Sequence, residues 1–307
     1  MPLLARINNL MEFYWTVEKE ESQQVKVFLK EQGISKGLLA KIKFQGGKIE
    51  VNHSVENALF KLSFGDQVKV TIPDEKEHET LLVEDVPIDI VFEDDHYLVV
   101  NKPAGVASIP AQYHPNGTMA NRVKAYYKKQ EYKNQVIHVV TRLDRDTTGL
   151  MLFAKHGFAH AMLDQELRKK AVIKIYQALV GGSTSELKEH TIIQLPIGRD
   201  LSSILKRKIV ETGQQAETEY WLTKRKGDEA LVNIQLHTGR THQIRVHFEA
   251  IGCPLLGDEM YGGKMDSGIE RQALHCCKLS FIHPFTKQRL ELTSPLAEDM
   301  RKIVDRL

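Results

Sequence analysis

Apolar residues recur along this chain with the two-residue spacing of strands in some segments and the helical spacing in others, which predicts alternating strands and short helices. Met11–Val17 is rich in aromatic and β-branched residues, which is typical of a strand. Apolar positions at helical spacing then predict two helices, one capped by Ser22 and ended by Gly33, and a second capped by Ser35. Two strand-like runs complete this part of the chain, Lys48–Asn52 and Gln67–Ile72.

A charged segment with little apolar periodicity, residues 74–86, separates this part from a longer one. Strand and helix patterns alternate again beyond it. The predicted strands are Ile88–Phe92, Tyr97–Val100, Val172–Val180 and Glu229–His237, and the predicted helices are Met119–Lys129 and His156–Lys170. We therefore expect an α+β chain with a small domain over residues 1–73, a linker over 74–86 and a second domain over 87–307.

The composition is typical of a soluble globular protein and leaves room for two domains. The chain has 307 residues, of which 42% are apolar, and its formal charge is only +2, so any contact with nucleic acid must come from local basic patches. Its three cysteines lack a Cys-x-x-Cys spacing, which argues against a disulfide framework and a zinc site. Neither a long apolar run nor a signal-peptide pattern occurs, so we expect a cytoplasmic protein without a membrane segment.

The densest charge lies in Val140–Met151, between two apolar runs that are typical of strands. Two arginines alternate with Asp144 and Asp146 there, and two threonines and a glycine follow. A carboxylate between buried strands is desolvated unless a cation pairs with it, and a desolvated, paired carboxylate is typical of a nucleophile or base. A salt-bridged structural loop explains these residues equally well, because ion pairs also occupy turns.

The residues from Arg142 to Leu150 read Arg-Leu-Asp-Arg-Asp-Thr-Thr-Gly-Leu, which resembles the catalytic signature of the RluA-type pseudouridine synthases. Those enzymes isomerise uridine in RNA to its C-glycoside, and the resemblance implies that Asp144 is the catalytic aspartate. Thr141 stands where the family usually has a histidine. Further motifs of the family follow in order over residues 87–307: Asn101–Gly105, Lys174–Ala178, Thr238–His247 and Cys253–Gly262. The resemblance also implies a catalytic domain with a mixed, mainly antiparallel sheet.

The same resemblance implies roles for other residues. Tyr176 would line the uracil pocket, Arg245 would pair with Asp144, and Arg240 would contact the substrate. A carboxylate and a guanidinium about 4 Å apart attract by roughly 4 kcal/mol at an effective dielectric near 20, which would keep Asp144 ionised in a dry pocket. The glycosidic bond is out of reach in a stacked nucleotide, so the base must be extruded, and Arg142 is placed to occupy the gap or hold phosphate. The chemistry needs no cofactor, and no P-loop or dinucleotide motif occurs.

Residues 21–73 resemble the αL RNA-binding module that was first seen in a ribosomal small-subunit protein. Lys36, Lys41 and Lys43 of the second predicted helix would then face phosphates. An ordinary solvated face explains these lysines without any ligand, and residues 1–73 are near neutral by count. The same two interpretations apply to a basic run at Lys206–Lys208.

Two other functions fit parts of the sequence. Asp144 and Asp146 have the Asp-x-Asp spacing that can hold Mg²⁺, but Arg142 and Arg145 would compete with a cation, so we expect no metal. A non-catalytic RNA- or ribosome-binding protein on the same scaffold is favoured only by Thr141. We therefore predict a monomeric RNA pseudouridine synthase that acts on ribosomal or transfer RNA. The sequence leaves open which uridine is modified and whether Asp144 attacks C1′ or removes a ribose proton.

Overall fold

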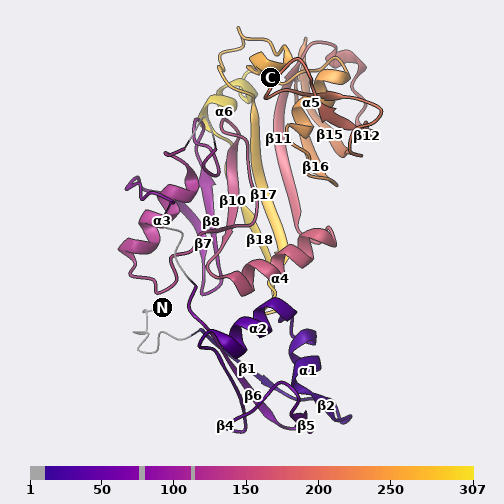
Figure 1. Ribbon diagram of the computed structural model, residues 1–307. Coiled ribbons are helices and arrows are strands. Elements are labelled where there is room, and N and C mark those ends of the chain that lie inside the picture. Colours follow the sequence, from indigo (N-terminus) through magenta and orange to yellow (C-terminus); the bar gives the residue numbers. More distant parts are fainter. Residues whose placement is uncertain (1–10, 76–79, 112–114) are drawn as a thin grey trace.

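The structure is a computed structural model that describes residues 11–75, 80–111 and 115–307 (Figure 1). Within these ranges the chain builds a small unit, drawn in indigo, and a larger one above it. Each unit has its own sheet and its own cluster of buried apolar side chains. None of the helices in these ranges combines the length and hydropathy that a bilayer-spanning helix needs.

The small unit packs two helices against an antiparallel sheet with strand order β1-β6-β3-β4. Its elements are β1 (Met11–Thr16), β2 (Gln23–Gln24), α1 (Val25–Glu31), α2 (Lys36–Phe44), β3 (Lys48–Val51), β4 (Ser54–Val55), β5 (Lys61–Leu62) and β6 (Gln67–Ile72). The cap at Ser35 is confirmed, because its Oγ accepts a hydrogen bond from Leu38 N at 3.1 Å. The cap at Ser22 is wrong: Gln23 and Gln24 extend as β2 and pair with β5, so α1 begins only at Val25.

The larger unit is organised around a ten-stranded sheet whose main path runs β12-β15-β16-β11-β17-β10-β8-β7. The first half of the unit comprises β7 (Asp89–Glu93), β8 (Tyr97–Lys102), α3 (Met119–Lys129), β9 (His138–Val139), β10 (Thr148–Ala154), α4 (Gly157–Arg168), β11 (Ile173–Gly181) and β12 (His190–Gln194). The second half comprises β13 (Ile197–Arg199), β14 (Arg207–Ile209), β15 (Glu217–Lys226), β16 (Glu229–Leu236), α5 (Gln243–Ala250), β17 (Leu274–Ile282), β18 (Arg289–Thr293) and α6 (Glu298–Val304). Among the described residues only β10 and β17 pair in parallel, which confirms the mixed, mainly antiparallel sheet.

The middle of this sheet brings together three strands that are far apart in the sequence. β17 lies between β10 and β11, and Cys276 is the register partner of both Gly149 and Tyr176. Gly149 has φ +106°, and a Cβ built on it would lie 2.3 Å from Cys276 O. Only glycine fits this close approach of β10 to β17.

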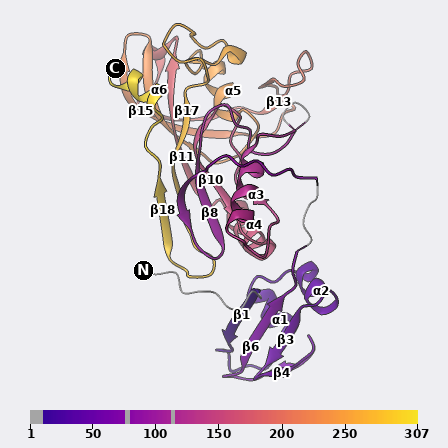
Figure 2. The same ribbon diagram turned by 90° about the vertical axis from the view of Figure 1, so that its left-hand side faces the viewer.

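The two units meet at α4, which lies between the large sheet and the small unit in both views (Figures 1 and 2). Phe13 of β1 packs against Phe158 of α4 with ring centroids 4.9 Å apart and against Phe285 at 5.6 Å. Glu75, just after the small unit, accepts hydrogen bonds from Gly157 N at 2.6 Å and pairs with His138 Nε2 at 2.6 Å. Apolar packing and a partly buried carboxylate therefore hold the small unit at this end of the sheet.

Candidate active site

The loop that carries Asp144 runs between β9 and β10 and is fixed along its backbone. Ser108 Oγ donates to Leu143 O at 2.6 Å and accepts from Leu143 N at 2.9 Å. Thr147 N donates to Asp144 O at 3.2 Å, which closes a turn directly after the aspartate. The Asp144 side chain itself keeps 29% of its surface exposed. The main chain is therefore held while the carboxylate faces open space.

Lys102 fixes the next residue of the loop. Its side chain is buried, and its Nζ donates to three carbonyl oxygens: Arg145 O and Val106 O at 2.6 Å each, and Pro103 O at 2.9 Å. Burial lowers the pKa of Lys102 to about 7, and the nearby carboxylates oppose this shift. Three carbonyl acceptors require three N–H donors, so the ammonium form is the one that fits. A lysine beside a turn carries no sequence signal of burial, and this contact was not predicted.

Thr141 has a defined place in the same loop. It is buried, its Oγ1 accepts a hydrogen bond from Leu152 N at 3.0 Å, and its own N–H donates to Leu152 O at 3.2 Å. The threonine thus ties the start of the loop to β10. A residue other than histidine at this position still supports the loop that holds Asp144.

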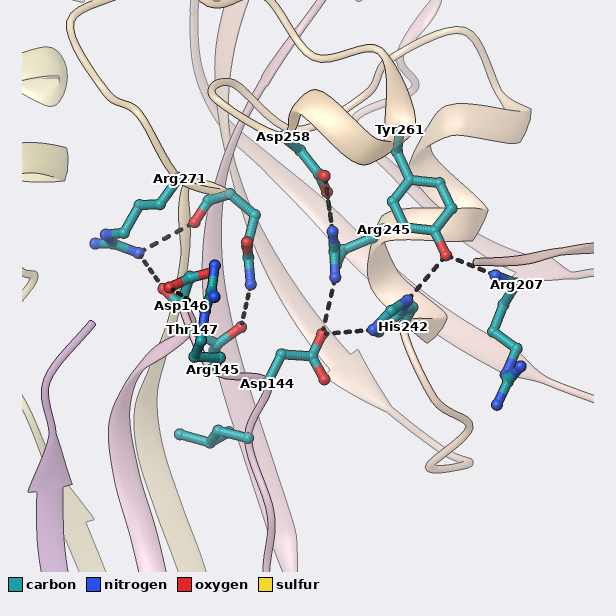
Figure 3. Close-up of polar contacts among 12 residues, drawn as sticks. Asp144, Arg145, Asp146, Thr147, Arg207, His242, Arg245, Asp258, Tyr261 and Arg271 are labelled. Carbon is teal, nitrogen blue, oxygen red and sulfur yellow. Dashed lines mark hydrogen bonds and ion pairs between the residues drawn. The ribbon is translucent and has the colours of Figure 1, made fainter. Parts of the chain in front are cut away.

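Arg245 lies between two aspartates, and Figure 3 shows it bridging them. Its Nη1 is 3.4 Å from Asp144 Oδ2. Its Nε and Nη2 form the closer, bidentate pair, with Asp258 Oδ2 at 2.7 Å and Oδ1 at 2.8 Å. Burial opposes the charge on Arg245, but the two carboxylates outweigh it and raise its pKa. The predicted partner of Arg245 was Asp144 alone, but Asp258, whose side chain is 1% exposed, takes the fork.

His242 is a second, unpredicted neighbour of Asp144. Its Nε2 lies 3.9 Å from Asp144 Oδ2, and its Nδ1 is 3.0 Å from the hydroxyl of Tyr261 (Figure 3). The Tyr261 hydroxyl also accepts from Arg207 N at 2.9 Å. Burial lowers the pKa of His242, with Asp144 opposing and Arg245 adding to the shift. The ring is therefore neutral at neutral pH.

The start of α5 explains how His242 reaches this position. His242 has left-handed backbone angles, φ 57° and ψ 20°, and α5 begins after it at Gln243. The N-cap of α5 is His242, which makes no side-chain capping hydrogen bond. The side chain of Gln243 instead holds the segment before the helix: its Oε1 accepts hydrogen bonds from Arg240 N at 3.0 Å and from Thr238 Oγ1 at 2.7 Å. This local bend brings His242 toward Asp144.

These residues surround one pocket of about 410 Å³, within the range of small-molecule sites. Its walls come from the loop before β10, from β11 and from the segment that leads into α5. The predicted site residues that line it are Arg142, Asp144, Tyr176, Arg240 and Arg245, together with the unpredicted Lys174 and His242. Arg142 is exposed at the rim, and Arg240 Nε donates to Gln215 O at 3.0 Å. The pocket thus gathers residues from motifs about a hundred positions apart.

Tyr176 and Lys174 form the β11 wall of the pocket. Burial raises the pKa of Tyr176 well above its usual value, with Cys276 and Asp144 adding to the shift, so the hydroxyl stays protonated. Burial lowers the pKa of Lys174, whose Nζ makes no hydrogen bond or ion pair with any described residue. A flat ring and a polar head therefore face the same space as the carboxylate of Asp144.

The lysines assigned to RNA in the small unit do not belong to this pocket. Lys36, Lys41 and Lys43 are exposed along α2. The structure therefore separates the predicted substrate contacts into a pocket and a distant basic helix. Asp146 does not line the pocket with Asp144 either, and its carboxylate pairs with Arg145 Nη2 at 2.9 Å. No group of three potential metal-binding side chains is found in residues 11–75, 80–111 and 115–307.

Comparison with known proteins bears on what this pocket does. Residues 96–250, which include the Asp144 loop, Tyr176 and Arg245, match the model of the RNA pseudouridylate synthase family. The chain is also 45% identical over 280 residues to an uncharacterized RNA pseudouridine synthase of Bacillus subtilis, YjbO, covering 91% of this chain and 98% of that protein. This chain belongs to the RNA pseudouridine synthases. It is an isomerase that forms pseudouridine in RNA.

Other relatives of the synthase agree with this assignment. The ribosomal large subunit pseudouridine synthase D of Pseudomonas aeruginosa is 36% identical over 266 residues, with 82% of each chain covered. The solved structure of human RNA pseudouridylate synthase domain containing 4 superimposes with a TM-score of 0.57 at 23% identity, covering 71% of this chain and 92% of that one. At that identity the likeness supports the fold alone.

Proposed function

We propose that this synthase isomerises a specific uridine in structured RNA, with Asp144 as its nucleophile or base. The contact between Asp144 and Arg245 carries the proposal. A partly exposed carboxylate meets a buried guanidinium at 3.4 Å, at the wall of a pocket of about 410 Å³. A buried guanidinium at that distance attracts the carboxylate and orients it at the wall of the pocket.

The reaction breaks the C1′–N1 bond, joins C1′ to C5 and releases the C5 proton. The base has to leave the stack to reach Asp144, and Arg142 at the rim is placed to occupy the vacated position or to hold phosphate. Tyr176, protonated and buried, packs against the uracil ring. The carboxylate either attacks C1′ or removes a ribose proton, and in both routes Arg245 stabilises its charge before it reacts.

Ribosomal RNA is the substrate that we place first, with transfer RNA second. Relatives that cover more than four fifths of this chain include enzymes named ribosomal large subunit pseudouridine synthase D. The exposed lysines of α2, Lys36, Lys41 and Lys43, add positive charge on the small unit, where we propose that RNA outside the pocket is held. Mapping pseudouridines in RNA from cells that lack this protein would identify the modified uridine.

Replacing Asp144 tests the catalytic role. We expect Asp144→Asn to abolish tritium release from RNA that carries 5-tritiated uridine, while RNA affinity is retained. Asp146→Asn is the matched control: its carboxylate pairs with the exposed Arg145, so we expect less than about a tenfold loss. An active Asp144→Asn enzyme would refute the assignment. A wild-type protein that binds RNA but releases no tritium would favour the non-catalytic alternative, which Thr141 alone suggests.

A further inference from the structure

Two side chains of the segment just before β17 hold the loop that follows Asp144. Arg271 Nη1 donates to Asp146 O at 2.9 Å, and Figure 3 shows this guanidinium pointing at the loop. Gln272 Nε2 donates to Thr147 Oγ1 at 3.4 Å. Arg271 and Gln272 both lie outside the lining of the catalytic pocket. They therefore meet the loop from behind, on the side away from the substrate.

The guanidinium of Arg271 is itself fixed from its other side. Its Nε is 2.7 Å from Asp299 Oδ2, and its Nη2 is 2.8 Å from Asp299 Oδ1. Its Nη1 also meets Gln272 O at 3.1 Å and Leu274 O at 3.4 Å, and its side chain is only 9% exposed. Burial raises the pKa of Asp299, but the contact with Arg271 outweighs it and lowers this pKa. A charged fork thus joins α6, which carries Asp299, to the catalytic loop.

Arg271 completes a set of contacts in which each carbonyl oxygen of residues 143–146 has a hydrogen-bond donor. The donors are Ser108 Oγ for Leu143, Thr147 N for Asp144, Lys102 Nζ for Arg145 and Arg271 Nη1 for Asp146. A peptide group in such a loop cannot rotate without breaking one of these bonds. The path of the loop is therefore set by groups that do not touch the substrate.

The same segment also places Arg245, the partner of Asp144. Gly257 has φ +69°, and a Cβ built on it would lie 2.3 Å from Arg271 O, so the two backbones cross in contact. The residue after Gly257 is Asp258, which takes the fork of Arg245. One backbone crossing thus supports both the loop and the arginine. It thereby sets the 3.4 Å distance between Asp144 and Arg245.

We propose that Arg271 is a positioning residue of the synthase. Clamped by Asp299 of α6, it holds the loop at Asp146 O. The clamp keeps Asp144 at its working distance from Arg245, so Arg271 acts through the loop and not on the substrate. This inference deepens the proposed function and rests on it. An arginine with only a structural role would stabilise the fold without setting the rate of the folded enzyme.

Steady-state tritium release separates these two roles. We expect Arg271→Ala to lower kcat by about a hundredfold, the cost of a displacement of roughly 1 Å at reacting groups. KM for the RNA should stay near its wild-type value, because no contact with the substrate is removed. Activity is measured where urea unfolding shows each variant to be fully folded. Wild-type kcat in folded Arg271→Ala would overturn the proposal, and so would a raised KM at unchanged kcat.

Arg306→Ala is the matched control. Arg306 also joins a carbonyl oxygen to an acidic side chain near α6, with Ser267 O at 2.6 Å and Glu229 Oε2 at 3.5 Å. It has no contact with the catalytic loop, so we expect wild-type kcat and KM. A loss of kcat in Arg306→Ala equal to that in Arg271→Ala would show a general effect of this region and would count against the clamp.

A double-mutant cycle tests whether α6 acts through Arg271. We expect Asp299→Ala to lower kcat in the same direction as Arg271→Ala, and the double variant to be no slower than Arg271→Ala alone. Residues that act as one unit show this non-additivity, whereas independent sites multiply their effects on rate. Independent effects of the two substitutions would overturn the part assigned to α6.

The milder variant Asp299→Asn keeps the shape of the contact and tests the proposal if Arg271→Ala does not fold. Hydrogen exchange should then speed up at the amides of residues 144–148, while β11 keeps its wild-type protection. Equal acceleration in both places would mean loss of global stability and would refute the positioning role.

The Asp144→Asn enzyme distinguishes failure of this inference from failure of the proposed function. If Asp144→Asn is inactive and folded Arg271→Ala turns over like wild type, only the positioning role of Arg271 is refuted. If Asp144→Asn keeps its activity, the proposed function fails, and the clamp proposed for its loop fails with it.

Discussion

Asp258 provides the sharpest test of how the site is held together. It takes the bidentate fork of Arg245 at 2.7 and 2.8 Å, and both side chains are almost fully buried. Asp258→Ala removes the charge and both acceptors and leaves the guanidinium with Asp144 alone, at 3.4 Å. Breaking a buried ion pair by removing one partner typically costs about 3–5 kcal/mol, because the remaining charge is left buried and uncompensated.

The expected loss of activity follows from the position of Arg245. Without Asp258 the guanidinium is free to turn its fork toward Asp144, which shifts the carboxylate from the orientation fixed by the loop. A displacement of about 1 Å at reacting groups can cost roughly a hundredfold in rate. We therefore expect kcat for tritium release to fall by about that factor in Asp258→Asn, which keeps the shape and one acceptor, and further in Asp258→Ala.

Urea unfolding and tritium release at saturating RNA measure the two effects. Asp228→Ala is the matched control, because Asp228 pairs with Lys264 at 3.1 Å while 60% exposed, and exposed pairs are worth no more than about 1 kcal/mol. The reasoning fails if Asp258→Ala unfolds within about 1 kcal/mol of wild type, as expected for Asp228→Ala. It also fails if kcat is unchanged in a folded Asp258→Asn enzyme.

Three further predictions follow from the contacts of the site and of the junction between the units. Arg245→Lys should lose activity nearly as fully as Arg245→Ala in the tritium assay. A single ammonium cannot form the bidentate contact with Asp258 and still reach Asp144. Wild-type turnover by the lysine variant would contradict this. Lys102→Met should lower both the unfolding free energy and kcat, because three carbonyl oxygens lose the buried ammonium that joins them. A variant whose urea-unfolding midpoint equals that of the wild type would disprove this. Burial would raise the pKa of Glu75, but His138 and the Gly157 N–H outweigh it and hold this pKa below its usual 4.5. The stabilisation from these contacts is therefore present above pH 4.5 and is lost as the pH falls through the folded-state pKa. In acid unfolding, Glu75→Gln should lack this pH-dependent loss of stability.

The sequence by itself determined the elements and the chemistry-bearing residues. Met119–Lys129 is a helix with the predicted bounds, and the predicted strand Val172–Val180 corresponds to β11, which carries the predicted Tyr176 into the pocket wall. Such patterns are legible because burial repeats with the period of the backbone. The catalytic-type motifs were equally legible, because each is local in the chain.

Tertiary structure alone decided which partners these residues meet. Asp258 takes the fork of Arg245, Lys102 reaches the carbonyl of Arg145, and His242 faces Asp144 because its own backbone is left-handed at the N-cap of α5. These contacts join segments that are distant in sequence, and their energy comes from excluding water once the sheet has closed. No local pattern encodes such a pairing, since either partner alone reads as an ordinary surface charge or turn residue.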